Sequence, residues 1–349
     1  MPSPFEIARR ALTLATHRIR SLPIVVLMPH SRCNCRCVMC DVWKANRERR
    51  ELGRGDLAPH LEALRRLRTR WVVLSGGEAL MHSNLWTLCE LLKDDLGAKV
   101  TLLSTGLLLR RHAADVARWT DETIVSLDGP REVHDAVRGV PRAYDKLADG
   151  VAALREVAPR YRVSGRSVVQ RRNFRDLAGT LDAAREIGLD RISFLAADVS
   201  TEAFGRAVPW DGERAAGVAP DLDEARELAE GIERLVAERA ADFAAGFVAE
   251  SPEKMRRIAR YYLALNGGGD FPPPRCNAPW VSAVIEADGA VRPCFFHPVL
   301  GNVRERGLAE ILNSPAAVAF RRGLDVARDP VCRKCVCSLR LPPASDLPI

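Results

Sequence analysis

Short runs rich in β-branched residues alternate with helical patterns through the first two-thirds of the chain. Repeated strand–helix units favour a parallel sheet whose functional residues lie at the carboxyl ends of its strands. We therefore predict an α/β fold, a partial (β/α)6 barrel related to the TIM barrel, followed by a smaller C-terminal domain. The six predicted strands span residues 24–27, 71–75, 100–104, 123–127, 162–169 and 191–195. Helical patterns between them include residues 57–67, 85–92, 144–157 and 177–187.

Breaks in these patterns indicate where parts of the chain begin and end. Residues 196–220 have no clear period, which predicts a long loop bordering the active site. Glycines and prolines between residues 267 and 274 mark a boundary, and residues 281–291 beyond it alternate around Asp288-Gly289, which predicts a hairpin. The predicted parts are an N-terminal helical extension (1–22), the barrel (23–221), a helical connection (222–266) and the C-terminal domain (267–349).

Composition narrows the class of protein. The sequence has no apolar run near the ~18 residues of a membrane-spanning helix, and the stretch 11–15 is too short for a signal sequence. Ten cysteines without an export signal favour metal sites in a reducing cytoplasm over disulfides. The net charge of +7 comes from scattered arginines without a nucleic-acid-binding module, so we expect no nucleic-acid partner. The basic N-terminal pattern fits a helix on a membrane surface or one packed on the barrel, and we favour packing.

The first cysteine cluster directly follows the first predicted strand. Cys33, Cys37 and Cys40 are spaced to hold three irons of a four-iron cluster, which leaves the fourth iron open to a small ligand. A structural zinc site is the alternative, but no fourth Cys or His follows at finger spacing. We interpret Cys35 as a bystander thiol and Cys89, within a helical pattern, as a buried apolar residue.

This loop resembles the Cys-x3-Cys-x2-Cys hallmark of the radical S-adenosylmethionine (SAM) superfamily. The resemblance continues at Gly76, Gly77 and Glu78, which match the family motif whose glycines let the backbone approach SAM and whose carboxylate holds the SAM ammonium. Met39 stands where an aromatic residue often packs beside the adenine, and Ala79 replaces a common proline. The resemblance implies further SAM contacts by four residues at or beyond the next strand ends: Ser104, Ser126, Asp128 and Arg138.

The later cysteines resemble the auxiliary-cluster region of the SPASM and twitch subgroup of this superfamily. Cys276 and Cys294 flank the predicted hairpin, and Cys332 and Cys335 follow as a Cys-x2-Cys pair. The resemblance implies that these four thiolates bind an auxiliary [4Fe-4S] cluster, with zinc as the alternative. Cys337 is then a spare thiol, a substitute for Cys335 or, as a further hypothesis, a hydrogen-atom donor to a substrate radical.

Together the motifs imply an enzyme that cleaves SAM reductively and abstracts a substrate hydrogen with the 5′-deoxyadenosyl radical. We expect oxidation or rearrangement of a small metabolite, helped by the auxiliary cluster and by an external electron donor such as flavodoxin or ferredoxin. Radical modification of a ribosomally made peptide is one alternative, and a non-catalytic cluster- or metal-binding regulator is another. Phe194 is expected to border the active site. Arginines beyond the fifth strand either bind a substrate anion or are solvated helix-start residues: Arg171, Arg172 and Arg175.

Overall fold

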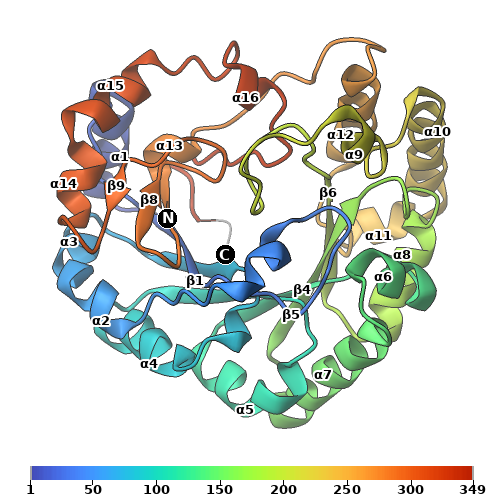
Figure 1. Cartoon of the computed structure of the whole chain (residues 1–349), viewed down its shortest axis with the longest axis horizontal. Helices are drawn as coiled ribbons and strands as arrows, with labels where there is room; N and C mark the ends of the chain where they lie inside the picture. Colours follow the sequence, from blue (N-terminus) through green and yellow to red (C-terminus); the bar gives the residue numbers. More distant parts are fainter. Residues whose placement is uncertain (1, 348–349) are drawn as a thin grey trace.

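One curved sheet forms the centre of the protein (Figure 1). The computed structural model describes residues 2–347, and its strands are β1 (Ile24–His30), β2 (Trp71–Gly76), β3 (Lys99–Ser104), β4 (Glu122–Ser126), β5 (Arg162–Val169), β6 (Arg191–Ala196), β7 (Ser282–Ile285), β8 (Ala290–Arg292) and β9 (Gly301–Asn302). Their order is β6-β5-β4-β3-β2-β1-β7-β8-β9. The pairs from β6 to β7 are parallel, and β8 and β9 extend the sheet antiparallel.

The protein's helices lie mostly around the outer face of this sheet. They are α1 (Pro4–Thr16), α2 (Arg54–Leu57), α3 (Leu61–Arg66), α4 (Leu85–Glu90), α5 (Leu109–Trp119), α6 (Arg131–Arg138), α7 (Ala143–Val157), α8 (Leu177–Glu186), α9 (Gly212–Ala216), α10 (Leu222–Glu238), α11 (Ala240–Ala244), α12 (Pro252–Leu265), α13 (Ala278–Val281), α14 (Leu308–Asn313), α15 (Pro315–Gly323) and α16 (Pro330–Arg333). Shorter turns are η1 (Val42–Arg47), η2 (Ala58–His60), η3 (Ala79–Met81) and the π-turn η4 (Leu91–Asp95).

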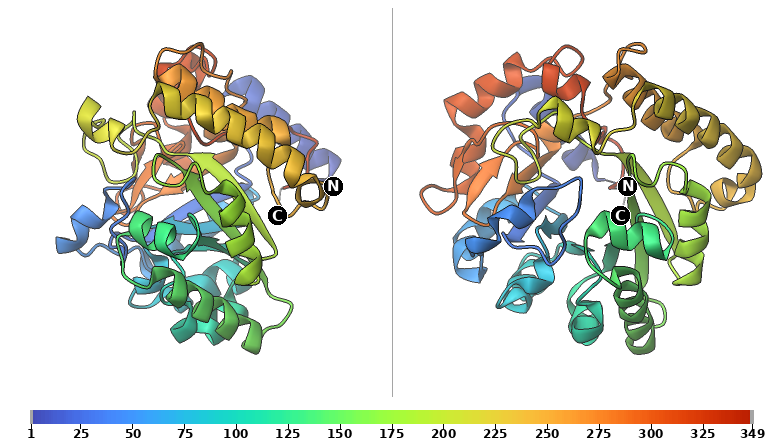
Figure 2. Two further views of the ribbon diagram at one scale, coloured as in Figure 1. Left: turned by 90° about the vertical axis from the view of Figure 1, so that its right-hand side faces the viewer. Right: turned by 45° about the vertical axis from the view of Figure 1, so that its right-hand side comes forward.

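Apolar side chains on both faces hold the strands in the interior. Leu27 of β1, Leu74 of β2 and Ile285 of β7 are fully buried on adjacent strands. Parallel strands covered on both faces are typically continuous apolar runs of this kind. The long helices α10 and α12 lie side by side across one end of the sheet (Figure 2). A capping box starts α10, in which Asp221 and Glu224 each accept the other's backbone N–H at 3.0 Å.

The six predicted barrel strands are all present, and the predicted hairpin is β7 and β8. The predicted helix over 57–67 is divided among α2, η2 and α3, because Pro59 in η2 lacks a backbone N–H to continue an α-helix. The predicted loop after β6 contains the short helix α9. The pairing of β7 with β1 joins the C-terminal segment to the barrel sheet. The division into four parts stays a prediction.

The N-terminal helix α1 packs against the other end of the chain. Its Arg10 donates to the carbonyl of Ser345 at 2.8 Å and pairs with the buried Glu6 one turn earlier at 2.5 Å. Arg321 of α15 donates to the carbonyl of His17 at 2.8 Å. These contacts agree with the packed interpretation of the basic N-terminal pattern. In residues 2–347 no helix is long and apolar enough to cross a membrane.

Candidate active site

The first cysteine loop leaves β1 and is fixed by neighbours from distant segments. Asn46 bonds both backbone groups of Cys33, accepting from its N–H at 2.9 Å and donating to its carbonyl at 2.8 Å. Arg36 N–H donates to the carbonyl of Arg138 at 2.9 Å, so the end of α6 holds the middle of the loop. Cys37 is buried, whereas Cys33 and Cys40 are partly exposed. The three predicted cluster ligands therefore stand on a loop whose backbone is fixed on two sides.

The glycines after β2 let this loop lie directly against the strand end. A Cβ on Gly77 would be 2.0 Å from the carbonyl oxygen of Arg32, the residue before Cys33. Gly76 has a φ of +103°, a conformation that side chains rarely adopt. Glu78 N–H donates to the same Arg32 carbonyl at 2.8 Å. The close approach of the Gly-Gly-Glu motif to the cysteine loop thus requires glycine.

The carboxylate of Glu78 is fully buried at the end of β3. It accepts from the N–H of Thr105 at 2.7 Å, from the hydroxyl of Thr105 at 2.6 Å, from Ser104 Oγ at 3.0 Å and from the N–H of Leu80 at 3.1 Å. Burial raises the pKa of Glu78, and these hydrogen bonds oppose the rise. The structure therefore shows Glu78 joining the ends of β2 and β3, and its predicted contact with the SAM ammonium stays a prediction.

Asp128 and Arg138 form a buried ion pair beneath Cys37. Arg138 Nη2 lies 2.5 Å from Asp128 Oδ2, and its Nη1 donates to Cys37 Sγ at 3.5 Å. Asp128 Oδ1 accepts from the N–H of Val168, which ties the pair to β5. A hydrogen bond from Cys35 and the charge of Arg138 lower the pKa of Cys37 to about 6, against the effect of burial. A thiolate is thus favoured at Cys37, as an iron ligand requires.

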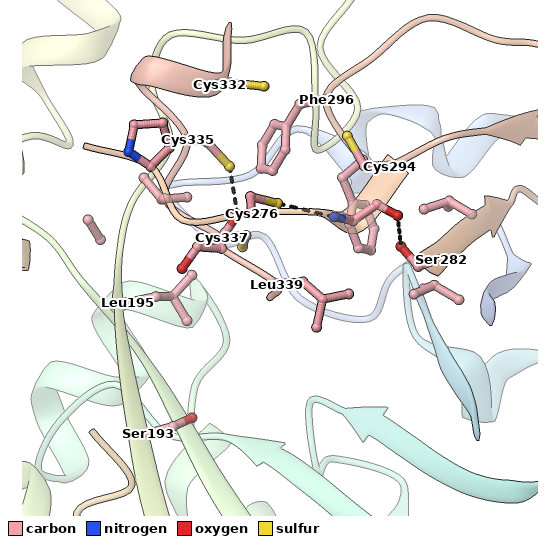
Figure 3. A pocket seen from close by; sticks show the side chains of 18 of the residues that line it. Ser193, Leu195, Cys276, Ser282, Cys294, Phe296, Cys332, Cys335, Cys337 and Leu339 are labelled. Atoms are coloured by element: carbon pink, nitrogen blue, oxygen red, sulfur yellow. Dashed lines mark hydrogen bonds between the residues drawn. The ribbon is translucent and has the colours of Figure 1, made fainter. Parts of the chain in front are cut away.

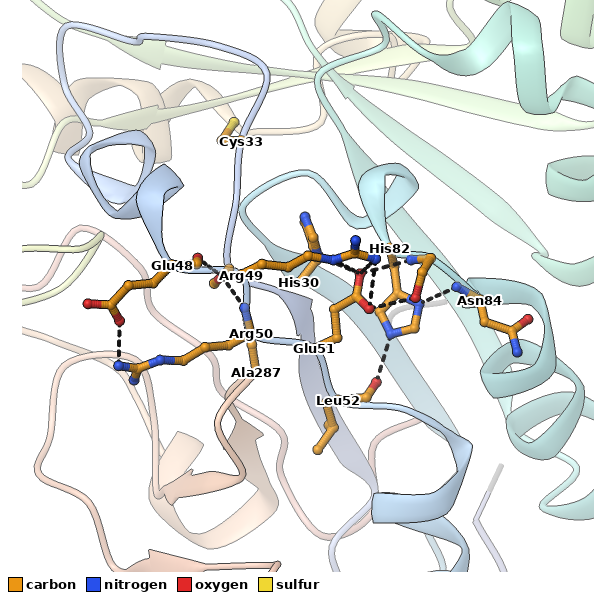
Figure 4. Close-up of polar contacts among 12 residues, drawn as sticks. His30, Cys33, Glu48, Arg49, Arg50, Glu51, Leu52, His82, Asn84 and Ala287 are labelled. Carbon is orange, nitrogen blue, oxygen red and sulfur yellow. Dashed lines mark hydrogen bonds and ion pairs between the residues drawn. The ribbon is translucent and has the colours of Figure 1, made fainter.

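The segment returning from the cysteine loop is tied down by Glu51 (Figure 4). Glu51 accepts from the N–H of Ser83 at 2.9 Å and from its hydroxyl at 2.6 Å, and it lies 3.1 Å from Nδ1 of the buried His30. Arg49 donates to the same carboxylate. Despite partial burial, hydrogen bonds from Ser83 and Arg49 lower the pKa of Glu51 to about 2. This network joins the end of β1 to the segment after Gly-Gly-Glu.

The five C-terminal cysteines lie around one cavity of about 380 Å³ inside the barrel. Figure 3 shows them gathered around Phe296, with Leu195 of β6 next to Cys337 and Ser193 further along the same strand. All five are free thiols: Cys276, Cys294, Cys332, Cys335 and Cys337. Strand residues of the barrel interior, among them Val26, Val73 and Leu103, form another part of the walls, and α12 contributes residues such as Lys254 and Tyr261. The structure thus brings the four predicted auxiliary ligands and the spare Cys337 together on a cavity that the barrel strands also line.

His297 and Asp329 stand beside Cys332 and form with it a possible metal-binding group. His297 Nε2 lies 3.3 Å from Cys332 Sγ, a hydrogen-bond distance. Asp329 is already used as the cap of α16, where its carboxylate accepts the N–H groups of Val331 and Cys332. Each cysteine ligand of a four-iron cluster binds a different iron, so two ligands of one cluster do not lie within hydrogen-bond distance of each other. At this distance His297 is better placed to donate a hydrogen bond to the Cys332 sulfur than to bind iron.

Phe204 connects the two cysteine regions. Its carbonyl accepts from the N–H of Asp41 at 2.9 Å and lies 3.7 Å from Cys40 Sγ. Its ring centroid is 6.4 Å from that of Phe295 and 6.1 Å from that of Phe296, the two residues after Cys294. The loop beyond β6 therefore borders both cysteine regions. Phe194 lines the cavity, and its place at the active site stays a prediction.

Comparison with known families identifies this arrangement. The model described as the radical SAM superfamily matches residues 27–194. The SPASM model, an iron-sulfur cluster-binding domain, matches residues 276–336. The chain belongs to the radical SAM superfamily. As a radical SAM enzyme with a SPASM domain it uses SAM and [4Fe-4S] clusters, and the zinc-only and regulator interpretations are set aside.

Two curated relatives of this radical SAM enzyme come from Methanosarcina barkeri (strain Fusaro / DSM 804). One is an Fe-coproporphyrin III synthase, 26% identical over 333 residues, covering 90% of this chain and 80% of the relative. The other is an AdoMet-dependent heme synthase, 24% identical over 318 residues, covering 88% and 85%. A third relative is the subtilosin biosynthesis protein AlbA of Bacillus subtilis (strain 168), 25% identical, covering 69% of this chain and 48% of AlbA.

Solved structures of other radical SAM enzymes share the fold. Streptococcus suis SuiB bound to its precursor peptide SuiA superimposes with a TM-score of 0.63 at 16% identity, covering 97% of this chain and 77% of SuiB. Native anSMEcpe with bound AdoMet gives 0.63 at 17% identity, covering 89% and 86%. At these identities the likeness establishes the barrel and its C-terminal extension.

The residues of this radical SAM enzyme fit the cofactors that its family binds. The cysteine loop carries four thiols, three of them at the superfamily spacing, and Asn34 Nδ2 and Arg32 Nε are buried donors without a hydrogen-bond partner in residues 2–347. Met39 is buried there, with Gln170 Nε2 3.6 Å from its sulfur. Ser126 ends β4 in register with Arg166 of β5. The ligand and SAM-contact assignments of individual residues remain proposals.

Sequence reasoning missed several residues of the site. Arg166 lies in the middle of β5 and faces the cavity, and its charge within a central strand was a visible signal, because such strands are normally apolar. No sequence pattern marked Phe204 as a site residue, since its contacts join segments far apart in the chain. Of the arginines beyond β5, Arg171 pairs with Asp221 at 3.0 Å and Arg175 pairs with Glu227 at 2.6 Å. These ion pairs favour the helix-start interpretation over a substrate-anion site.

Replacing Cys35 with alanine is expected to leave iron content and SAM cleavage unchanged. Cys35 is buried and its N–H faces Cys33 Sγ at 3.5 Å, but the superfamily spacing is complete without it. The measurement is iron and 5′-deoxyadenosine quantification on reconstituted protein, with Cys89→Ala as a matched buried-thiol control. A loss of about four irons in Cys35→Ala alone would make Cys35 a ligand.

Cys335 and Cys337 are expected to differ in iron content when each is replaced by alanine. The SPASM match ends at residue 336, and Cys335 Sγ lies 2.7 Å from the Cys337 carbonyl. Cys335→Ala is expected to lose about four irons, whereas Cys337→Ala keeps all of about eight. Cys337 has accessible surface that faces the cavity. If Cys337→Ala loses the iron and Cys335→Ala keeps it, Cys337 is the fourth ligand. An unchanged turnover in Cys337→Ala would reject the hypothesis that Cys337 is a hydrogen-atom donor.

Proposed function

We propose that this radical SAM enzyme abstracts hydrogen from a small molecule bound in the barrel cavity and oxidises or rearranges it. The observation that carries the proposal is the cavity itself. Barrel strands β1 to β6 line one part of it, and the auxiliary cysteines of the SPASM domain line the other. A molecule held there lies against both regions at once, as an oxidation completed with an auxiliary electron acceptor requires.

When bound, the cofactors supply the 5′-deoxyadenosyl radical and a nearby acceptor for the second electron. The chain's own residues position and protect the substrate. Trp71, Val73 and Phe295 give the cavity apolar, aromatic walls that exclude water from a reactive centre. An external one-electron donor of the flavodoxin or ferredoxin class is part of this proposal.

Iron porphyrins bearing carboxylates are the first substrate class to test. Two relatives that cover most of this chain are an Fe-coproporphyrin III synthase and a heme synthase. The walls of the cavity combine aromatic side chains with several cationic ones, which suits a flat apolar ring with acidic substituents.

Deuterium transfer is the direct test of the proposed substrate class. Reconstituted protein is incubated anaerobically with SAM, reductant and Fe-coproporphyrin III deuterated in its propionate chains, and 5′-deoxyadenosine is analysed by mass spectrometry. We expect deuterated 5′-deoxyadenosine and a change in porphyrin mass, both absent from the Cys33→Ala/Cys37→Ala/Cys40→Ala variant. SAM cleavage that the porphyrin neither stimulates nor labels would reject this substrate class.

A ribosomally made peptide is the second candidate substrate. It is favoured by the relative AlbA, a bacteriocin biosynthesis protein, and by the fold shared with SuiB, which was crystallised with its precursor peptide. Under this alternative a peptide, rather than the porphyrin, stimulates 5′-deoxyadenosine formation. Crosslinked, epimerised or matured peptide in the same mass-spectrometric assay would establish it.

A further inference from the structure

Arg166 is an arginine on a central strand whose side chain faces the interior of the barrel. Its strand, β5, lies between β4 and β6, and Arg166 is in register with Ser126 on one side and Ser193 on the other. The side chain lines the cavity together with Ser193, whose hydroxyl accepts from Arg166 Nε at 3.2 Å. The Arg166 side chain is exposed at the cavity surface, so its charge is accessible to a ligand held there.

Within residues 2–347, Arg166 lacks the ion pairs that the neighbouring arginines of the sheet make. In residues 2–347 no carboxylate forms an ion pair with Arg166, although the other two arginines of these strands are paired. Arg162 of the same strand lies 3.5 Å from Glu122, and Arg191 of β6 lies 3.2 Å from the same carboxylate. Arg162 and Arg166 lie two side-chain repeats apart on the same face of β5, so they are directly comparable. Arg166 therefore has hydrogen-bond donors free to face the cavity.

The cavity walls as a whole also carry more positive than negative charge. Among the described residues its walls carry one carboxylate, Glu250, which already accepts from the N–H of Phe194 at 2.7 Å and pairs with Lys254 at 3.3 Å. Against this single carboxylate stand four cationic residues: Arg166, Lys254, Arg257 and Arg333. An apolar cavity with an excess of positive charge favours an anionic ligand.

The geometry points to Arg166 as the binding site for a carboxylate or phosphate group of the substrate, with Lys254 of α12 on the same cavity wall. This inference rests on the proposed function, since the anion belongs to the molecule held in the cavity. A guanidinium binds a carboxylate or phosphate through two parallel hydrogen bonds, so Arg166 both attracts the anion and sets its orientation. Ser193, by accepting from Nε, leaves the terminal nitrogens of Arg166 for the ligand.

Two other anionic groups are also candidates for binding Arg166. The auxiliary cluster is anionic and its ligand candidates share the cavity with Arg166, so the arginine could balance the cluster charge. The carboxylate of SAM is a second candidate, because Ser126, a predicted SAM contact, is in register with Arg166. Each partner predicts a different loss when the charge is removed, and these losses can be measured separately.

The first experiment maps phenylglyoxal labelling of arginines in the reconstituted enzyme by mass spectrometry, with and without glutarate or inorganic phosphate. An anion at ten times its Kd is expected to slow labelling of Arg166 about tenfold while leaving Arg162 unaffected. Stronger protection by glutarate identifies a carboxylate ligand, and stronger protection by phosphate identifies a phosphate ligand. Failure of both anions to protect Arg166 would overturn the inference.

The second experiment compares Arg166→Met, Arg166→Lys and the same-strand control Arg162→Met. Absorbance titrations use coproporphyrin III and its tetramethyl ester, and SAM affinity and iron content are measured on the same samples. Arg166→Met is expected to weaken binding of the acid about tenfold or more, with no change for the ester, for SAM or for iron. Arg166→Lys is expected to retain part of the affinity, and Arg162→Met all of it.

The outcomes separate this inference from the proposed substrate class. If phosphate or glutarate protects Arg166 but neither porphyrin binds, the anion site stands and the porphyrin proposal fails. If acid and ester bind equally well to wild type and to Arg166→Met, porphyrin binding stands and the inference fails. A selective loss of SAM affinity, or of about four irons, in Arg166→Met would assign the arginine to SAM or to the cluster and overturn the inference.

Discussion

Replacing Cys33, Cys37 and Cys40 together with alanine is expected to lower the iron content from about eight to about four per chain and to abolish SAM cleavage. The remaining iron belongs to the auxiliary site, whose cysteines line the cavity, whereas the three replaced cysteines are not among the residues that line it. The loss of 5′-deoxyadenosine formation should be at least about 10³-fold, because the chemistry is that of the cofactor held by this loop. Anaerobic iron and sulfide quantification with product analysis measures both effects.

The matched control is Cys89→Ala, which removes a thiol that is fully buried in the core. It is expected to keep about eight irons and full SAM cleavage, with a modest loss of stability from the small cavity. A triple variant that keeps eight irons, or one that still forms 5′-deoxyadenosine, would contradict the assignment of these three ligands. Thermal unfolding followed by circular dichroism shows whether either variant is misfolded.

Gly77→Ala is expected to cause the largest effect of any single methyl group added to this protein. The new Cβ would stand 2.0 Å from the carbonyl oxygen of Arg32 and 2.6 Å from its carbonyl carbon, and both are backbone atoms that cannot rotate away. The cysteine loop must therefore shift, at a cost of ~3 kcal/mol in unfolding free energy. A displacement of this size at the cofactor site should lower SAM cleavage about 100-fold.

Gly55→Ala provides the control for Gly77→Ala. A Cβ on Gly55 meets no atom within 4 Å, and the residue lies within helix α2, where alanine is favourable. We expect it to match wild type in melting temperature, iron content and turnover. Wild-type turnover and melting temperature in Gly77→Ala would show that the strand end and the cysteine loop do not approach as closely as the structure indicates.

Local sequence patterns were sufficient to predict the barrel strands and the motifs at their ends. Strands such as β2 are short, largely apolar runs between helical patterns, and their boundaries follow from the change of period. The Gly-Gly-Glu motif can be recognised locally as well, although the close contacts that require Gly76 and Gly77 are made with β1 and the loop after it. The same local patterns were sufficient to predict that Cys33, Cys37 and Cys40 directly follow β1.

Contacts between distant segments could not be predicted in the same way. The addition of β7 to β1 joins residues more than 250 positions apart, and nothing in either strand names its partner. The Asp128–Arg138 ion pair beneath Cys37 was also unexpected, because the family resemblance implies SAM contacts for both residues. Only the folded structure shows that β5, β6 and α12 bring Arg166 and Lys254 to the cavity that the auxiliary cysteines border.

Electron paramagnetic resonance of the reduced, reconstituted protein, recorded before and after adding SAM, tests the central claim most directly. The account predicts two [4Fe-4S]⁺ signals, because the protein has one cysteine group of three and another of at least four. Only one signal should shift with SAM, since only a cluster with three cysteine ligands has an iron open to it. A single signal, or two signals that both stay unchanged when SAM is added, would contradict the account.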